Sequence, residues 1–247
     1  MQNKSIGNIN FIVNDVRNYE LTYLLLAPGS SSGNFFDAFF KFFPQNELVI
    51  APDYPGRGMS PTQADNSINA VALAIDKALR EINASNVTIV ALSYGTQIAI
   101  ELAKLNPKIY KQILLIAPGP FFSNISRKLL TILFVIPNYV TVLLPYYRKL
   151  VIFLGLFNKD EFPDKNLREM NEQWLSNINY ELSYKKILSI PIKVYKYIDD
   201  VYSKKDSENT LHGLFSNLVE VEINDKHPVT KEDYLKVFES QSFLKNL

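Results

Sequence analysis

Continuous apolar runs that alternate with amphipathic stretches are the feature that most restricts how this 247-residue chain can fold. Four such runs lie in its first half: Leu21–Ala27, Glu47–Ala51, Val87–Leu92 and Gln112–Ala117. Three segments expected to form helices separate them: Phe35–Phe43, which is rich in aromatic residues, Ile68–Ile82 and Thr96–Leu105. Strands that are apolar along their whole length are typical of a parallel sheet covered on both faces. With right-handed crossovers, the pattern predicts an α/β fold with a doubly wound, mostly parallel sheet.

The alternation stops after Pro120 and resumes near residue 191, and the segment between has a helical pattern. Three more elements are expected beyond it: strands at Ile192–Tyr197 and Leu218–Ile223, and a helix from about Lys231. The sequence therefore predicts one core, formed by residues 1–120 and 191–247, with a helical insertion at 121–190. This length is ordinary for a single α/β domain.

The composition excludes several classes of function. The chain has 26 basic and 25 acidic residues and a net charge of +1, so no overall field favours nucleic acid. It has no cysteine, which excludes disulfides, thiol nucleophiles and thiolate-bound metal. Only two histidines are present, His212 and His227, so a histidine-rich metal site is not expected. Polar residues interrupt the N-terminal apolar runs; we therefore expect no signal peptide and a cytoplasmic protein.

One serine stands at a turn from a strand into a helix. The strand Val87–Leu92 runs into Ser93-Tyr94-Gly95, and a helical pattern follows. A sharp turn of this kind exposes a serine hydroxyl above the edge of the sheet, and it needs small neighbours. The usual pattern is G-x-S-x-G, and here Ala91 replaces the first glycine. Ser93 is the candidate nucleophile, and the alternative is a serine in an ordinary strand–helix turn.

A second loop could supply hydrogen-bond donors to the same site. The strand at Leu21–Ala27 is followed by Pro28–Asn34, with the sequence PGSSSGN. Acyl transfer places negative charge on a carbonyl oxygen, and two backbone N–H groups can stabilise that charge. The candidates for this oxyanion hole are Ser30, directly after the Pro-Gly turn, and Tyr94, directly after the serine. The alternative is a flexible Ser/Gly loop without a site.

Three blocks of sequence together resemble the α/β-hydrolase family of serine hydrolases. They are PGSSSGN at Pro28–Asn34, DYPGRGMS at Asp53–Ser60 and ALSYG at Ala91–Gly95. The resemblance implies the α/β-hydrolase fold and assigns the helical insertion as a lid. It covers most of the chain and is weakest across the insertion. The chain departs from the family pattern at Ala91, at Pro28, where histidine is more usual, and at Tyr197, where the family has glycine.

The resemblance also implies an acid and a base, in the chain order serine, acid, histidine. Asp200 follows the expected strand at Ile192–Tyr197 and is the candidate acid, and a shift of one residue in the turn would select Asp199 instead. His227 lies after the last expected strand, where the family has its catalytic histidine, and we expect it to act as general base. His212 is interpreted as a surface residue.

The insertion carries the information about substrate and partners. Its segment Leu129–Tyr147 is uncharged, but prolines and its place between two strands of one sheet favour lid helices over a membrane span. Basic residues flank this segment: Arg127, Lys128, Arg148, Lys149 and Lys159. They suit an acidic acyl-carrier protein, as for the pimeloyl-acyl-carrier-protein methyl ester esterases of biotin synthesis, or an anionic membrane surface. Ordinary solvated charge is the alternative.

The sequence thus favours a serine hydrolase that cleaves a carboxylic ester of an apolar acyl group through an acyl-enzyme, with no cofactor and no metal. The expected partner is a small-molecule or carrier-linked ester. Two alternatives stay open: a thioesterase, acyltransferase or lyase with the same triad, and a non-catalytic binding scaffold. The sequence does not specify the oligomeric state.

Overall fold

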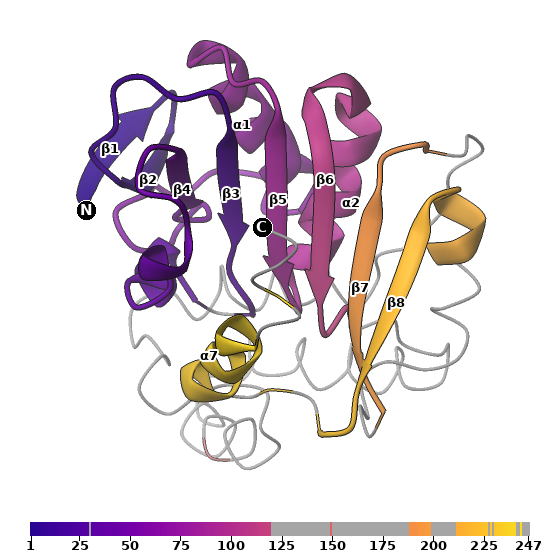
Figure 1. Cartoon of the computed structure of the whole chain (residues 1–247). Coiled ribbons are helices and arrows are strands. Elements are labelled where there is room, and N and C mark those ends of the chain that lie inside the picture. The colour runs from indigo at the N-terminus through magenta and orange to yellow at the C-terminus, as the bar shows by residue number, and fades with distance from the viewer. Residues whose placement is uncertain are drawn as a thin grey trace.

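The computed structural model describes residues 1–29, 31–119, 149, 188–198, 211–226, 228, 230–240 and 243. In this part of the chain, eight strands form one sheet in the order β1-β2-β4-β3-β5-β6-β7-β8 (Figure 1). Their bounds are β1 Gln2–Ile6, β2 Ile9–Val13, β3 Thr22–Leu26, β4 Leu48–Pro52, β5 Val87–Leu92, β6 Tyr110–Ile116, β7 Ile192–Tyr197 and β8 Leu218–Ile223. The strands from β4 to β8 in the sheet order pair in parallel. The predicted mostly parallel α/β sheet is therefore confirmed.

The central strands are buried along their whole length, as their composition predicts. Every residue of β3, β4 and β5 is buried, because helices or packed loops cover both faces of the sheet. β8 lies at one edge, and its residues are only partly buried or exposed. Glu220 and Glu222 on this strand place charge at the edge, which disfavours pairing with another chain.

The sequence analysis missed the first two strands. β1 and β2 form an antiparallel hairpin that places Ile6 opposite Ile9, and β2 then pairs antiparallel with β4. The polar residues of β1 are exposed and Gly7 lies at the turn of the hairpin, at φ +58°, whereas Asn10 of β2 is buried. The sheet is thus parallel apart from one antiparallel extension.

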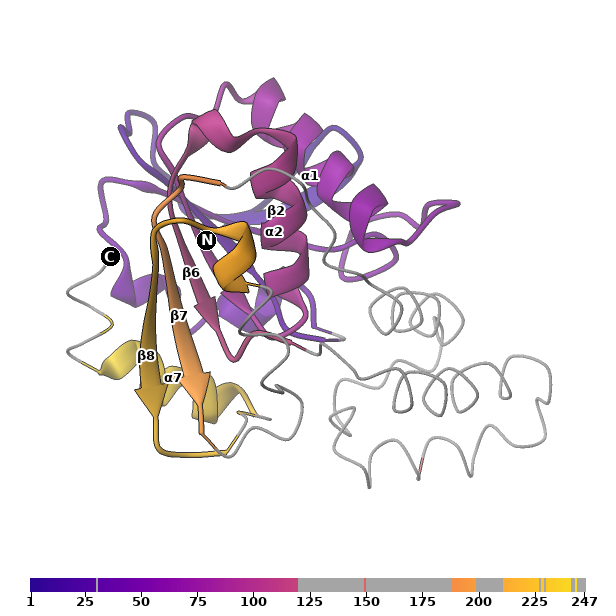
Figure 2. The same cartoon turned by 90° about the vertical axis from the view of Figure 1, so that its right-hand side faces the viewer.

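Helices lie on both faces of the sheet. α1 (Ile68–Glu81) and α2 (Gly95–Leu105) cover one face, and α7 (Lys231–Glu239) covers the other (Figures 1 and 2). The Ser67 hydroxyl caps α1 by accepting the Ala70 N–H at 3.2 Å. A reciprocal capping box between Thr230 and Asp233 starts α7.

The aromatic segment at Phe35–Phe43 is not the helix that its pattern predicts. It forms two short 3₁₀ helices, η1 (Gly33–Phe36) and η2 (Phe40–Phe42). The Phe39 ring contacts Phe238 of α7 edge-on, with the ring centroids 4.8 Å apart. Aromatic residues lose rotamer freedom in a helix, so packing against α7 outweighs a weak helical preference here.

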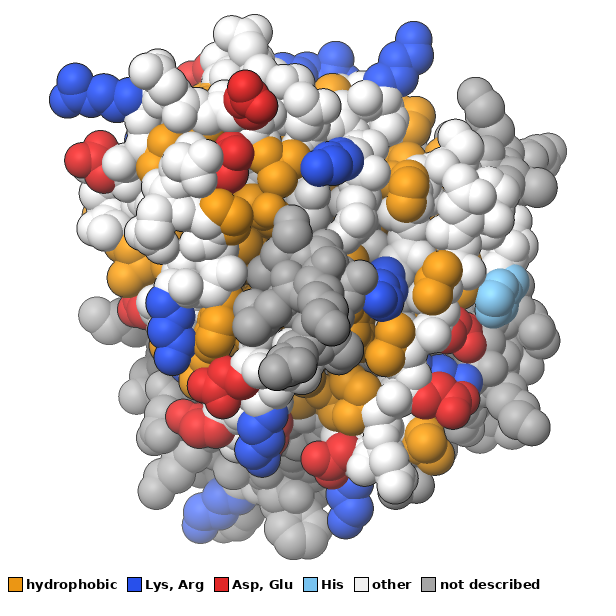
Figure 3. All heavy atoms as spheres, in the orientation of Figure 1, with side chains coloured by type: hydrophobic (Ala, Val, Ile, Leu, Met, Phe, Trp, Pro, Cys, Tyr) orange, Lys and Arg blue, Asp and Glu red, His pale blue; other side chains and the backbone are white. Residues whose placement is uncertain are grey.

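Two further predictions concern the surface. The side chain of His212 is 54% exposed and lies 3.3 Å from Glu220, which confirms that it is a surface residue. On the face seen in Figure 3, acidic and basic side chains are interspersed and form no large patch of one sign.

None of the helices in the described part of the chain is long and apolar enough to cross a membrane. Except for Lys149, Leu188, Ser189 and Ile190, the predicted insertion lies outside the described residues.

Candidate active site

The turn between β5 and α2 has the geometry predicted for a nucleophile turn. β5 ends at Leu92, Ser93 follows, and α2 begins two residues later at Gly95. The Ser93 N–H donates to the Ile116 carbonyl of β6 at 3.0 Å, and the Ser93 carbonyl accepts the Thr96 N–H at 2.9 Å. The turn is therefore fixed by the neighbouring strand on one side and by the first turn of the helix on the other.

Ser93 has a backbone conformation that L-residues rarely adopt. Its φ is +45°, in the left-handed region, which costs a non-glycine residue about 1–3 kcal/mol. Such strain persists only where the surroundings hold it, and it concentrates at functional sites. It is the conformation expected of a serine that is turned out of a strand end into an active site.

Ser93 is also accessible within an otherwise buried segment. From Val87 to Ile100 every residue is buried except Ser93, which is half-buried. The turn thus presents one partly accessible side chain at the end of a buried strand. This is the arrangement that a nucleophile requires.

Gly95 allows this turn to lie against the neighbouring strand. A Cβ at Gly95 would lie 2.5 Å from the carbonyl oxygen of Leu26 and 2.9 Å from its Cβ. Leu26 ends β3, so the N-terminus of α2 is in direct contact with the end of that strand. The loop after β3 and the turn at Ser93 are therefore adjacent.

Tyr94, the predicted oxyanion donor after the serine, is buried beside the loop that follows β4. Its ring packs edge-on against Tyr54, with the centroids 5.6 Å apart. Burial raises the pKa of the Tyr94 phenol to about 12, and the nearby Arg57 guanidinium acts in the opposite direction. Among the described residues, no acceptor forms a backbone hydrogen bond with the Tyr94 N–H. This N–H can therefore bind an anion at the N-terminus of α2.

The loop after β3 is tied to the DYPGRGMS block at several points. The Tyr54 hydroxyl donates to the Ala27 carbonyl at 2.9 Å, and the Gly33 N–H donates to the Asp53 carboxylate at 2.8 Å. Between these points, Arg57 donates to the carbonyls of Gly29 and Ser31. The backbone conformation of the predicted oxyanion loop is therefore set by side chains of a second loop.

Asp53 is the buried centre of that second loop. Its carboxylate accepts hydrogen bonds from the Asn10 side chain at 2.7 Å and from the N–H groups of Gly33 and Met59 at 2.8 Å. Gly58 is required here, because a Cβ would lie 2.2 Å from the carboxylate and the residue has φ +51°. Ser60 completes the network by donating to the Asp53 carbonyl at 2.7 Å. These hydrogen bonds hold the Asp53 carboxylate in one orientation between β2 and the two loops.

The loops predicted to carry the acid and the base start at the same edge of the sheet. β7 pairs in parallel with both β6 and β8, with Tyr197 opposite Ile223. The carboxyl ends of β5, β7 and β8 therefore point to one edge, which is the lower edge in Figure 1. Ligand sites of open parallel sheets lie at this edge.

Four of the predicted site residues lie outside the described residues: Ser30, Asp199, Asp200 and His227. Their positions are therefore expected from topology alone. The structure describes the strands and residues that flank them, including Gly29, Ile198 and Lys226. Ser93 and Tyr94 are described, and both lie in the predicted turn.

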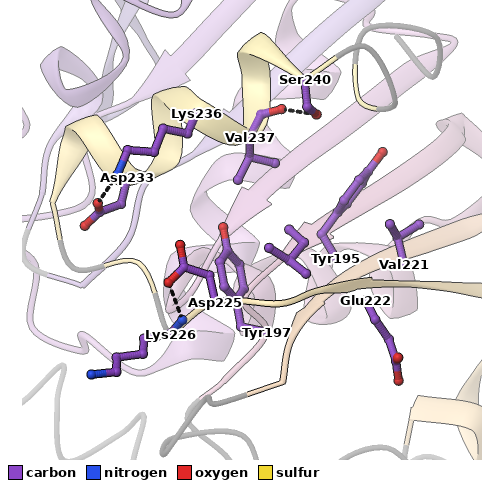
Figure 4. A pocket seen from close by; sticks show the side chains of 11 residues that line it. Tyr195, Tyr197, Val221, Glu222, Asp225, Lys226, Asp233, Lys236, Val237 and Ser240 are labelled. Atoms are coloured by element: carbon purple, nitrogen blue, oxygen red, sulfur yellow. Dashed lines mark hydrogen bonds and ion pairs between the residues drawn. The ribbon is translucent and has the colours of Figure 1, made fainter.

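A pocket of about 470 Å³ lies between α7 and the ends of β7 and β8 (Figure 4). Its wall includes Tyr197, Asp225 and Lys226 on one side and Lys236 on the other. Neither Ser93 nor Tyr94 is among the described residues that line it. It is consequently a pocket beside the turn at Asp225 and Lys226, and the described part of its wall does not include the candidate nucleophile Ser93.

No group of three His, Asp or Glu side chains in the described part of the chain is arranged to hold a metal ion. The sequence analysis named the block Asp53–Ser60 for its resemblance alone, and it gave no supporting role to Asn10, Asp53, Tyr54 or Arg57. The only sequence signal for their role was an aspartate and an arginine within a glycine-containing loop. Polar residues in a loop are ordinarily exposed, so the sequence did not predict that these would be buried.

Comparison with known proteins places these features in a family. The family model described as "Alpha/beta hydrolase family" matches residues 24–203. No curated protein matches the sequence. Solved structures share its fold at low identity. A thermophilic esterase from Thermogutta terrifontis has a TM-score of 0.75 and 15% identity, and the match covers 100% of this chain and 99% of that one.

Two further structures with this fold have names that give different activities. A marine microorganism esterase has a TM-score of 0.72 and 16% identity, with 97% of this chain and 99% of that one covered. A variant of an epoxide hydrolase from Bacillus megaterium has a TM-score of 0.74 and 14% identity, with both chains covered in full. At these identities the likeness establishes the fold alone.

The contact between α2 and β3 predicts a specific effect of Gly95→Ala. The added methyl would overlap the Leu26 backbone, which cannot move without disrupting the centre of the sheet. We expect the free energy of unfolding to fall by about 2–4 kcal/mol in a denaturant titration, as for an overpacked core. Gly213→Ala is the matched control, because a Cβ there meets nothing within 4 Å. Equal stability of the two variants would contradict the close packing of the turn.

Proposed function

The chain belongs to the α/β-hydrolase family, and from that premise we propose that it is a serine hydrolase that cleaves carboxylic esters of apolar acyl groups. The observation that carries the proposal is Ser93, held at φ +45° at the end of a central strand and accessible within a buried segment. Strain and partial exposure at one serine are the properties of an attacking hydroxyl.

The proposed reaction has two halves. The Ser93 oxygen attacks the acyl carbon while His227 takes the hydroxyl proton, and Asp200 keeps the imidazole in the required tautomer. The N–H groups of Tyr94 and Ser30 hold the negative oxygen of the tetrahedral intermediate. His227 then gives its proton to the departing alcohol, which leaves an acyl-enzyme. Water, activated by the same histidine, releases the acid and restores the Ser93 hydroxyl.

The presence of serine at this turn favours an ester over an epoxide as substrate. The fold occurs in both esterases and epoxide hydrolases, so it does not decide between them. A serine that attacks an acyl carbon forms an ester with the enzyme, and water can hydrolyse that ester. If the serine opened an epoxide, it would become an alkyl ether that water does not cleave. A turnover cycle through Ser93 therefore requires an acyl substrate.

Labelling with a fluorophosphonate tests the nucleophile. We expect the native chain to gain the mass of one phosphonyl group and Ser93→Ala to gain none, because only an activated serine attacks the phosphorus. Hydrolysis of p-nitrophenyl esters should fall about 10⁶-fold in the same variant. Intact-mass spectrometry measures the first effect and absorbance the second. An unlabelled native chain would favour a non-catalytic binding scaffold.

Separate substitutions test which aspartate supports the histidine. We expect Asp200→Asn to lower kcat about 10³–10⁴-fold, because the amide cannot hold the imidazole in the tautomer that accepts the serine proton. Asp199→Asn should change kcat less than tenfold and serves as the matched control. The reverse pattern would assign the acid to Asp199, and small effects in both variants would exclude this loop.

We further propose that the ester is presented by an acidic acyl-carrier protein. The support is the set of basic residues around the apolar part of the predicted lid, of which Lys149 is described and exposed. Exposed ammonium and guanidinium groups attract an acidic partner and speed association at low salt. The same residues would also attract an anionic membrane surface.

Reversing the charge of these basic residues tests whether an acidic carrier protein presents the ester. Replacing Arg127, Lys128, Arg148 and Lys149 together by Glu should raise KM for a carrier-bound methyl ester about tenfold at low salt. KM for the free methyl ester should not change. A control chain reverses four exposed lysines elsewhere: Lys4, Lys77, Lys111 and Lys236. If both chains process the carrier-bound ester like the native protein, a carrier partner is excluded.

A further inference from the structure

Thr96 lies in the first turn of α2, and both of its donors bind the carbonyl oxygen of Ser93. The residue is completely buried. Its N–H donates to the Ser93 carbonyl at 2.9 Å, and its side-chain hydroxyl donates to the same oxygen. A carbonyl oxygen has two lone pairs and can accept both hydrogen bonds. The Ser93 carbonyl is therefore held from two positions by one residue.

The Thr96 hydroxyl is itself oriented by the loop after β6. While it gives its proton to the Ser93 carbonyl, its oxygen accepts the Gly119 N–H at 3.4 Å, which is a long hydrogen bond. That loop is tied to the sheet, because the Ala117 N–H donates to the Tyr195 carbonyl of β7 at 2.9 Å. The hydroxyl thus lies between the serine turn and a loop that the next strand holds in place.

The direction of the Ser93 carbonyl determines the direction of the Tyr94 N–H. The two groups belong to one peptide unit, and in a planar trans peptide the C=O and the N–H point in opposite directions. A carbonyl held on the side of Thr96 therefore turns the Tyr94 N–H toward the other side. Among the described residues, no backbone acceptor binds this N–H. It is the N–H that the proposed reaction uses to hold the negative oxygen.

The strained backbone of Ser93 makes this restraint necessary. Its φ of +45° is a conformation that persists only where the surroundings hold it. On the strand side, the Ser93 N–H is bound to the Ile116 carbonyl at 3.0 Å. On the helix side, the bonds from Thr96 hold the carbonyl. If the helix side were loosened, the peptide unit between Ser93 and Tyr94 could rotate, and the N–H would turn with it.

We propose that Thr96 is a positioning residue of the oxyanion hole: its hydroxyl holds the Ser93 carbonyl and so keeps the Tyr94 N–H aimed at the acyl oxygen. A donor that is already oriented needs no reorganisation when negative charge develops, and this makes an oxyanion hole effective. Thr96 does not touch the substrate. The inference rests on the proposed function, because an oxyanion donor has a role only if Ser93 performs acyl transfer.

Substitutions at Thr96 separate the role of its hydroxyl from that of its methyl group. Thr96→Val keeps the volume and removes the hydroxyl, and Thr96→Ser keeps the hydroxyl and removes the methyl. Thr22→Val is the matched control, because Thr22 is also completely buried in the central sheet but starts β3, at the opposite edge from Ser93. Among the described residues, the Thr22 hydroxyl has no hydrogen-bond partner.

Three quantities are measured for each chain. They are the rate at which a fluorophosphonate labels Ser93, kcat and KM for p-nitrophenyl butyrate, and Ki for a boronic acid that mimics the tetrahedral intermediate. Melting temperature is recorded beside them, so that a change in stability can be told apart from a change in the transition state.

We expect Thr96→Val to lower kcat and the labelling rate about tenfold, with KM within about threefold of native. The loss is smaller than the roughly 10²–10³-fold that follows removal of an oxyanion donor, because the Thr96 N–H still holds the carbonyl. The Ki of the boronic acid should rise by a factor similar to the loss of kcat. Thr22→Val should match the native chain in all three quantities.

Thr96→Ser should keep kcat within about threefold of native, although loss of a buried methyl lowers its melting temperature. A role in packing alone predicts the opposite order, because valine fills the site and serine leaves a gap. A valine variant that is slower than the serine variant, at an unchanged KM, is therefore what a merely structural role would not produce.

Two results would overturn the inference and leave the proposed function in place. One is a folded Thr96→Val chain that labels and turns over as fast as the native chain. The other is an equal loss of kcat in Thr96→Ser and Thr96→Val, which would assign the effect to packing.

If Thr96→Val does not fold, Thr96→Ser and Thr96→Ala carry the test, because both lack the methyl and they differ only in the hydroxyl. Equal kcat in that pair would overturn the inference, and a slower alanine variant would support it. A native chain that neither labels nor hydrolyses esters would overturn both the proposed function and this inference.

Discussion

The parallel pairing of β3 with β5 is the contact from which the rest of the site is arranged. Its register runs from Thr22 opposite Val87 to Leu26 opposite Ala91, so the two strands end at the same level. The loop after β3 and the serine turn after β5 must therefore leave the sheet side by side. A slip of one residue would turn every side chain of one strand to the other face. It would also move Gly95 away from the Leu26 backbone, against which the serine turn is built.

Beside this pairing, the buried side chains of Asp53 and Arg57 form hydrogen bonds with the backbone of the loop after β3. Asp53 and Arg57 lie in one short loop, and both bind the backbone of the loop after β3. Asp53 accepts a hydrogen bond from it, and Arg57 donates hydrogen bonds to it. The carboxylate accepts an N–H from Gly33, and the guanidinium donates to the Gly29 and Ser31 carbonyls. Burying charges is costly unless hydrogen bonds satisfy them, so such residues restrict a loop to one conformation. A loop rich in serine and glycine has little intrinsic order and gains it from these neighbours.

The central fold could be predicted from the sequence because its signals are local. Buried runs such as Val87–Leu92 contain no charged residue, and Ser67 and Thr230 have the chemistry of helix caps. The N-terminal hairpin was missed, because β1 is mostly exposed and its partner strand β2 has an ordinary apolar pattern only five residues long. The helix expected at Phe35–Phe43 was wrong, because contacts with α7, about 200 residues later in the chain, decide its conformation.

The site itself was only partly predictable. The turn that carries Ser93 and Tyr94 could be predicted from a strand, small residues and a helix in sequence, and the structure has that turn. The roles of the two residues stay predictions. The hydrogen bonds from Arg57 to the loop after β3 could not be predicted, because they depend on which carbonyls of a distant loop lie within reach of its side chain. The acid and the base were inferred from chain order alone.

The order of strands in the sheet has a consequence for synthesis on the ribosome. β6 pairs on one side with β5, which precedes it, and on the other with β7, from which residues 117–191 separate it. At ordinary elongation rates this interval takes about 4–15 s, far longer than a hairpin needs to form. During that time the nascent chain carries a half-built sheet whose open edge is the apolar segment Gln112–Ile116. The long interval between β6 and β7 in the chain therefore leaves an apolar strand edge unpaired until its partner strand has been synthesised.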